Sequence, residues 1–355
     1  MKFGRTLQEL AVELDRQNNA KRDFIVSSTA MVMNPESDII GLSRETDVGV
    51  NMVTPFKMTD LFHRQIGSSL NIPAKYYDLC RRDYPELLAK NVNGWLKKNS
   101  SRHTVRTLDG IARAFLSDRY RRIDNYEIAQ AVLPVIAEMP DARVESCEVT
   151  DNRMYLKIVN PRLQADVVPG DTVQAGIIIS NSEVGLGSVS VMPLIYRLIC
   201  SNGMCINDLG KRKYHVGREN EESWELFSDE TLRADDSAFM MKLADIVRTA
   251  VDETKFAMIV DRLRKTVAAK ISAPVVDVVE LTSKQYGFSK NESDGILQHL
   301  ITGGDLSLYG LSNAVTRTAN DSDNYDRATA LETAGWQIVT MAPQLWKSLN
   351  EVKMT

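Results

Sequence analysis

The chain has few cysteines, and they are not grouped. Its 355 residues include four Cys, and no two of them form a Cys-x-x-Cys pair. Cys80 and Cys147 are isolated, whereas Cys200 and Cys205 lie near each other, and none is grouped with the four His residues. This arrangement argues against a structural zinc site and favours free, buried thiols in a reducing compartment. The sequence therefore predicts neither a metal site nor a cofactor.

The chain also lacks a segment that would place it in or across a membrane. It contains no run of 18 apolar residues, so no transmembrane helix is expected. The N-terminal segment MKFGRTLQELAVEL is charged and amphipathic, without the hydrophobic stretch of a signal peptide. We therefore expect a protein that has no membrane partner and is located in the cytoplasm.

Motifs for nucleotide binding and for metal-dependent catalysis are missing. There is no GxxxxGK[ST] sequence, which argues against an ATP-driven recombinase or helicase, and Gly185-Leu186-Gly187 does not fit GxGxxG. Carboxylates do not occur at recognisable metal-binding spacing. His103 and His215 lie in basic stretches, with no carboxylate or nucleophile spaced to act beside them. The sequence thus predicts no catalytic residue and a protein that is not an enzyme.

What remains is the composition of an ordinary globular protein. Apolar residues make up 43% of the chain and charged residues 25%, which is enough for one sizeable core with a helical appendage. The formal net charge is −4. Because this charge is slightly negative, any nucleic acid would have to bind to a local basic patch.

Residues 176–205 carry the most informative pattern, GIIISNSEVGLGSVSVMPLIYRLICSNGMC. The β-branched run at 177–179 and the alternation after Ser188 predict two buried strands, joined by a turn rich in Gly. Arg197 lies inside the second apolar run. A buried guanidinium needs an anionic partner, so Arg197 is either paired internally or holds an anion such as phosphate.

Two hairpins are expected before this segment. Residues 103–107 and 111–116 flank an Asp-Gly pair, which is a strong hairpin signal. The runs RVESCEVT and RMYLKIVN form the second hairpin, and a helix over YEIAQAVLPVIAEM separates the two. The sequence therefore predicts an α+β fold, in which an antiparallel β-meander packs with a helix and a helical C-terminal region follows.

Helical periodicity marks the rest of the chain. Helices are expected near residues 4–19 and over 85–98, where Leu87, Leu88, Val92, Trp95 and Leu96 follow helical spacing. Residues 234–271 show long apolar periodicity, whereas the polar stretch 312–326 predicts a mobile loop. Three parts follow: an N-terminal α/β region (1–100), an α+β core with the meander (101–222) and a helical C-terminal region (223–355).

Basic residues gather in two stretches that contain aromatic residues. A basic groove with aromatic rings is typical of proteins that bind single-stranded nucleic acid, because cations follow the backbone and rings stack on bases. The alternative is a pair of solvated loops whose cations pair with acids elsewhere. With Arg197, the candidate residues are Arg102, Arg106, Arg113, Phe115, Arg119, Tyr120, Arg121, Arg122, Lys211, Arg212, Lys213, Tyr214, His215 and Arg218.

Several segments resemble a family of phage- and plasmid-like proteins called DUF932. They are LNIPAKYYDLC with VNGWL, then FLSDRYRRIDNYE, then ISNSEVGLGSVSVMPLIYRLICSNGM, with HVGRE and SLYGLSNAVTRTAND after them. The resemblance covers most of residues 60–330 and implies a mobile-element setting, in the cytoplasm of a bacterial host. The order of strands and helix is in turn similar, at the level of fold, to Rad52-like phage single-strand annealing proteins.

That similarity, the basic clusters and the missing nucleotide motif together predict ATP-independent binding and annealing of single-stranded DNA in phage or plasmid recombination and replication. The implied partners are single-stranded DNA and further copies of the chain, in a ring or filament. Two alternatives stay open: an interaction protein that binds a host protein, and an enzyme that processes nucleic acid.

Overall fold

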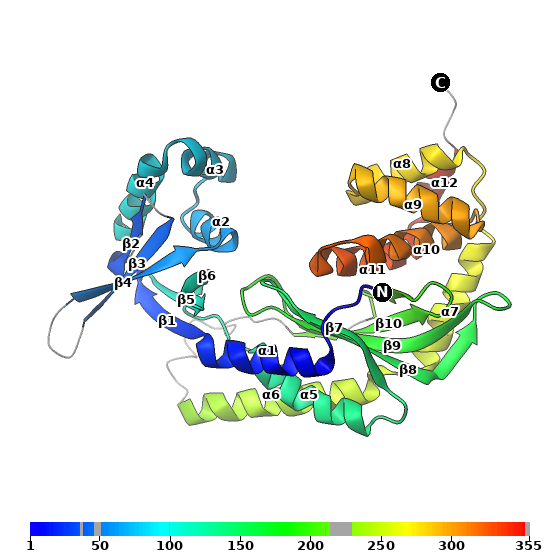
Figure 1. The fold of residues 1–355 in the computed structure, drawn as a ribbon, viewed down its shortest axis with the longest axis horizontal. Coiled ribbons are helices and arrows are strands. Elements are labelled where there is room, and N and C mark those ends of the chain that lie inside the picture. Colours follow the sequence, from blue (N-terminus) through cyan, green and yellow to red (C-terminus); the bar gives the residue numbers. More distant parts are fainter. Residues whose placement is uncertain (36–37, 46–50, 99, 210, 214–228, 352–355) are drawn as a thin grey trace.

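The computed structural model describes the chain except for residues 36–37, 46–50, 99, 210, 214–228 and 352–355 (Figure 1). Two six-stranded sheets organise it. The first has the order β1-β5-β6-β4-β3-β2 and is antiparallel except where β4 runs parallel to β6. Its strands are β1 (Arg22–Ser27), β2 (Met31–Asn34), β3 (Ile39–Glu45), β4 (Asn51–Met58), β5 (Arg102–Leu108) and β6 (Ile111–Ser117).

Three helices cover this sheet and complete what we call the first lobe, residues 22–117. They are α2 (Asp60–Ser69), α3 (Ala74–Asp83) and α4 (Pro85–Lys98), and the 3₁₀ turn η1 (Ser28–Ala30) joins β1 to β2. Phe62 and Ile66 of α2 pack in one core with Val105 and Phe115 of the sheet. This core anchors the helices to one face of the sheet.

The predicted Asp-Gly hairpin is confirmed, but its place in the fold was wrong. Asp109 and Gly110 adopt left-handed φ angles of 51° and 75°, which suit the tight turn between β5 and β6. The hairpin pairs with β1 on one side and β4 on the other, so it belongs to the first sheet and not to the meander. The expected boundary at residue 100 therefore cuts through the first lobe.

The second sheet is the predicted antiparallel meander, which confirms the α+β fold class. Its path is β11-β10-β9-β8-β7, with β12 also paired to β10. The strands are β7 (Arg143–Val149), β8 (Met154–Asp166), β9 (Thr172–Asn181), β10 (Val189–Arg197), β11 (Asn202–Cys205) and β12 (Lys211–Lys213). Helices α1 (Leu7–Ala20), α5 (Asn125–Glu138) and α6 (Asp229–Ala250) share one apolar core with this sheet.

The helical C-terminal region is confirmed, with two corrections. The periodicity over 234–271 belongs to two helices, because the side chain of Asp252 accepts a hydrogen bond from Lys255 N and caps a new helix. The helices after α6 are α7 (Glu253–Val267), α8 (Val275–Tyr286), α9 (Lys290–Gly303), α10 (Leu308–Thr318), α11 (Tyr325–Val339) and α12 (Pro343–Asn350).

The second correction concerns residues 312–326, which do not form an exposed loop. They contain the end of α10, the 3₁₀ turn η2 (Ala319–Asp321) and the start of α11. Ser312 and Thr318 are buried and donate hydrogen bonds to backbone carbonyls, which removes the cost of burying their hydroxyls. Most of the segment predicted as a loop is therefore helical, with only a short connection between η2 and α11.

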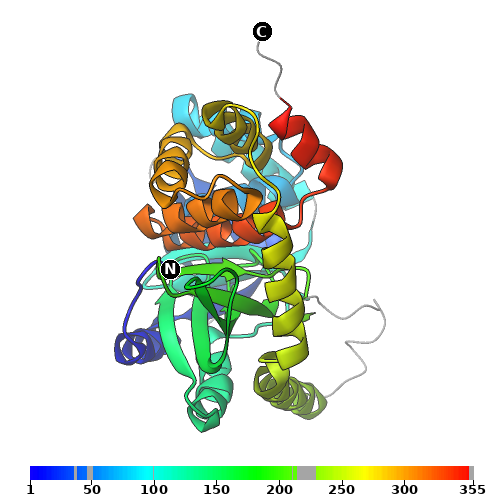
Figure 2. The ribbon, with the colours of Figure 1, turned by 90° about the vertical axis from the view of Figure 1, so that its right-hand side faces the viewer.

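Figures 1 and 2 show how these parts are arranged. The first lobe lies at one end of the molecule, α1, α5 and α6 run below the second sheet, and α8 to α12 lie above it. The described helices include none that is both long and apolar enough to span a bilayer. The segment between β6 and α5 and the turn after β9 meet where the first lobe joins the second sheet.

Candidate nucleic-acid interface

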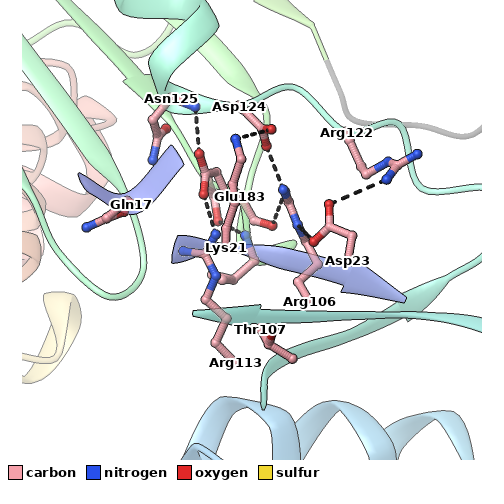
Figure 3. Close-up of polar contacts among 12 residues, drawn as sticks. Gln17, Lys21, Asp23, Arg106, Thr107, Arg113, Arg122, Asp124, Asn125 and Glu183 are labelled. Atoms are coloured by element: carbon pink, nitrogen blue, oxygen red, sulfur yellow. Dashed lines mark hydrogen bonds and ion pairs between the residues drawn. The ribbon is translucent and has the colours of Figure 1, made fainter. Parts of the chain in front are cut away.

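A buried charge network lies at this junction (Figure 3). Arg106 of β5 has no solvent exposure and forms ion pairs with Asp23 at 2.9 Å and with Asp124 at 2.6 Å. Its third group, Nη1, donates to the carbonyl of Glu183 at 3.0 Å. Burial opposes the charge on this guanidinium, but the neighbouring carboxylates outweigh that effect and raise its pKa. All three of its donor nitrogens are thus used inside the protein.

Glu183, in the turn after β9, contacts both the start of α5 and strand β6. One of its carboxylate oxygens accepts from Asn125 N at 2.7 Å, and the other pairs with Arg113 of β6. Lys21 pairs with Asp124 on the other side of the network. Burial would raise the pKa of Asp124, but Arg106 and Lys21 lower it below its usual value. The carboxylate of Asp124 is therefore held as an anion by these two cations.

The turn between β9 and β10 is also held by α2. Gln65 donates from Nε2 to Val184 O at 2.7 Å and accepts at Oε1 from Phe115 N at 2.8 Å. Gly185 has a φ of 79°, and a Cβ atom there would lie 2.5 Å from Leu116 Cδ2. A side chain at position 185 would therefore be strained by the left-handed backbone and would displace the end of the Leu116 side chain.

Four predicted phosphate ligands are committed to internal ion pairs, which corrects their assignment. Arg106 and Arg113 belong to the buried network described above. Arg121 pairs with Asp235 and Asp236 at the start of α6. Arg197 makes two hydrogen bonds of 2.7 Å to Asp171, so the internal alternative for this residue is the one observed.

The two aromatic residues predicted for base stacking near these arginines are covered by protein. Phe115 is buried between the imidazole of His103, with ring centroids 4.3 Å apart, and the ring of Phe62. Tyr120 is partly buried and donates its hydroxyl to Ser182 O at 3.0 Å. Since stacking needs an open ring face, neither residue offers a platform for a base.

Arg102 and Arg119 are exposed and lie on the same surface cavity. The cavity has a volume of about 470 Å³ and is formed between the end of α2 and the open end of the β5–β6 hairpin. Its lining consists of Ser69, Ser101, Arg102, His103, Phe115, Leu116, Ser117, Asp118 and Arg119. Two guanidinium groups and three hydroxyls can bind a phosphate by charge and by hydrogen bonds.

The imidazole of His103 adds no positive charge to this cavity at neutral pH. Burial lowers the pKa of His103, and the backbone and Asp118 offset this only in part. Its Nε2 atom is hydrogen-bonded to Ser101 Oγ at 2.8 Å. The positive charge of the cavity therefore comes from Arg102 and Arg119, with Asp118 as an opposing carboxylate.

The remaining predicted residues are Arg122, the three residues of β12 and three residues outside the described chain. Arg122 is half exposed and lies 3.6 Å from Asp23. Lys211, Arg212 and Lys213 form β12, which pairs with Val189–Val191 of β10. Tyr214, His215 and Arg218 are outside the described residues.

Two features were not predicted from the sequence. The first is Glu183, whose position in the turn after β9 gave no sign that it would pair with an arginine 70 residues earlier. The second is a set of exposed rings on α3 and α4. Helical spacing placed Trp95 with the core residues Leu88, Val92 and Leu96, yet Trp95 is 41% exposed. The sequence signal for this exposed ring was that the apolar positions of α4 cover more than one face of the helix.

Comparison with known proteins identifies one family. Residues 114–225 match the model of DUF932, a domain of unknown function, which confirms the resemblance seen in the sequence. The matched segment runs from β6 through α5 and the second sheet. No curated protein and no solved structure matches the chain. The chain is therefore similar to DUF932 over residues 114–225, and within this segment the Glu183 turn and the β6–α5 connection meet at the charge network.

Proposed function

We propose that this protein binds single-stranded DNA without ATP, and that the cavity lined by Arg102 and Arg119 holds its phosphates. The proposal rests on one observation: two exposed guanidinium groups and three serine hydroxyls line the same cavity. Phosphate oxygens accept hydrogen bonds from both kinds of donor, and contacts to guanidinium are the stronger ones.

The surroundings of the cavity support a single strand as the ligand. Arg102 and Arg119 stand at the open end of a hairpin beside helix α2, where the backbone of a flexible strand can follow the surface. The chain carries no nucleotide-binding motif, so binding proceeds without ATP. Contacts to phosphate of this kind make the affinity fall with salt.

The biological role that we propose is annealing of complementary strands during phage or plasmid recombination and replication. A strand longer than the cavity has room for several copies of the protein, so we propose that it acts as a homo-oligomer on DNA. Bound copies would hold a strand extended and expose its bases for pairing.

The double variant Arg102→Ala/Arg119→Ala tests the phosphate site. We expect its affinity for a fluorescent 20-nucleotide strand to fall by about tenfold or more at moderate salt, because two charged contacts are lost. The slope of log affinity against log salt should decrease by about 1.4 for two lost single-strand contacts. Fluorescence anisotropy over a salt series, without ATP or metal, measures both quantities.

The variant Arg162→Ala/Arg248→Ala is the matched control. It removes the same charge from two exposed arginines, which pair with Asp141 and Asp245 away from the cavity lining. Its affinity should stay within about twofold of the original protein. An equal loss in both double variants, or no binding by the original protein at low salt, would show that the proposal is wrong.

A further inference from the structure

We infer that the outer face of α3 and α4 is the surface on which bases of the bound strand stack. The inference rests on the proposed function, because it extends the same strand from the phosphate cavity onto a second surface. It also supplies what Phe115 and Tyr120 cannot, namely aromatic rings with open faces.

The two helices divide into a buried and an exposed face. Tyr77 and Cys80 of α3 and Leu88, Val92 and Leu96 of α4 are buried in the core of the first lobe. Large side chains beside this buried face remain in solvent, with exposed fractions of about four to six tenths, and one of them, Tyr84, lies between the two helices. They are Tyr76, Leu79, Tyr84, Leu87 and Trp95.

Contacts between the helices bring two of these rings onto one surface. Asn91 of α4 donates from its side chain to the hydroxyl of Tyr76 at 3.0 Å. Trp95 follows Asn91 by one helical turn and therefore projects from the same side of α4. The ring of Trp95 in turn has the ammonium of Lys98 at 5.0 Å from its centroid. A ring and a cation thus lie side by side on this face.

The charge of the surface is suited to an anion. Four exposed lysines belong to α3 and α4, namely Lys75, Lys90, Lys97 and Lys98. The carboxylate of Asp83 is paired with Arg82, which leaves Asp78 and Glu86 as the other acidic groups of the two helices. This excess of cations contrasts with the net charge of −4 for the whole chain. Of these lysines, Lys98 lies beside Trp95, so a polyanion is attracted to this side of α4.

The helices also begin and end next to the phosphate cavity. Ser69, on the cavity lining, is the last residue of α2 and precedes α3 by a short connection. Ser101 and Arg102, also on the lining, follow within four residues of the end of α4. Both helices thus connect directly to segments that line the cavity, and we place the nucleotides next to the bound phosphates on the face of Tyr76 and Trp95.

A partner protein is the other class of ligand for such a face, and the observations favour the nucleic acid. The exposed groups include three aromatic rings, with lysines beside them, rather than an aliphatic groove. Every base presents a flat face that stacks on such rings, while lysines contact the flanking phosphates.

The test compares two strands that differ only in their bases. The original protein should bind a 20-nucleotide thymidine strand about tenfold more tightly than an abasic strand of equal length, since stacking adds to phosphate contacts. Trp95→Ala and Tyr76→Ala should each lose most of this difference and bind the abasic strand as before. Trp95→Phe and Tyr76→Phe keep a ring and should retain it.

The outcomes separate this inference from the proposed function. If the original protein binds neither strand at low salt, the proposed function fails, and the inference fails with it. If it binds the thymidine strand but Trp95→Ala and Tyr76→Ala bind equally well, phosphate binding stands and stacking on this face is refuted. An equal loss on both strands would also refute stacking, because the rings would then act without the bases.

Discussion

His63 of α2 is a buried titratable residue at the core of the first lobe. Only 2% of its side chain is exposed, and Nδ1 lies 2.9 Å from the hydroxyl of Tyr77. Burial lowers the pKa of His63 to about 4, and the nearby Arg81 acts in the same direction, against the opposing effect of Asp38 and Asp60. The imidazole is therefore neutral in the folded protein at pH 5 and above.

This neutral state predicts a loss of stability in mild acid. The unfolded chain binds a proton at His63 below about pH 6.5, whereas the folded chain does not until about pH 4. Stability therefore falls as the pH decreases through this window, and His63 should lower the free energy of unfolding by about 2 kcal/mol between pH 7.5 and pH 5. Urea unfolding at the two pH values measures the change.

The variant His63→Gln, which cannot titrate, is the comparison for this prediction. Its free energy of unfolding should depend less on pH, with a remainder from His103, whose pKa is also lowered by burial. The same pH dependence in the variant and the original protein would mean that His63 is not the group responsible.

Single residues also show how far a sequence predicts a binding site. Arg197 lies in an apolar strand, so its guanidinium needs an anionic partner. A phosphate and an internal carboxylate meet that need equally well. Asp171, the observed partner, lies 26 residues earlier, at the start of β9. Arg106 and its partner Asp23 are 83 residues apart. Such pairs depend on tertiary contacts that no local spacing encodes.

At the scale of elements, the crossing of α10 and α11 depends on a small residue. A Cβ atom on Gly335 of α11 would lie 2.2 Å from Thr316 Cγ2 and 3.5 Å from Ser312 O. Gly335→Ala should therefore lower the free energy of unfolding by about 2 kcal/mol, because a methyl group has no room in this contact. Urea unfolding at neutral pH measures the effect.

A second glycine in a helix provides the opposite expectation. Gly94 of α4 is exposed, and a Cβ atom there meets no other atom within 4 Å. Gly94→Ala should raise the free energy of unfolding by up to about 1 kcal/mol, since alanine loses less backbone entropy in a helix. If Gly335→Ala were as stable as Gly94→Ala, close packing would not explain the glycine in α11.

The elements with a strong local pattern were predicted, and those stabilised by tertiary contacts were not. The Asp-Gly turn and the alternation of the meander strands identified both hairpins. The polar composition of residues 312–326 predicts a loop, but most of them lie in α10, η2 and α11. Their small side chains are instead buried and bonded to helix carbonyls, as Ser312 and Thr318 show. Composition alone does not distinguish a solvated segment from one packed by hydrogen bonds.

At the scale of the whole molecule, the first lobe and the part built around the second sheet contact each other through charged side chains. The core of the first lobe runs from Val26 to Phe115 and shares no residue with the other apolar clusters of the described chain. The junction carries the network of Arg106, Asp124 and Glu183. The sequence predicted the strands on both sides, but not that β5 and β6 would join the first sheet, because strand pairing between distant segments has no local signal.

The charge network predicts how the two bodies depend on each other. Glu183→Gln keeps the shape and the acceptor for Asn125 N but removes the partner of Arg113, which leaves a buried cation without its counterion. Breaking such a pair costs about 3 kcal/mol, so amides of β1 and β5 should exchange with solvent about 100-fold faster. Amides of β8 and β9, in a separate core, should keep most of their protection. Hydrogen exchange followed by mass spectrometry measures both sets in one sample.

The control is Glu148→Gln, which breaks the partly exposed pair between Arg5 and Glu148 and leaves the junction intact. Exchange in β1 and β5 should then change by less than about threefold, because exposed pairs contribute little. If Glu183→Gln accelerates exchange in both sheets equally, the two bodies unfold as one unit, and the junction is more than an electrostatic contact. A selective effect on the first lobe would instead show that Glu183 fixes this lobe to the second sheet.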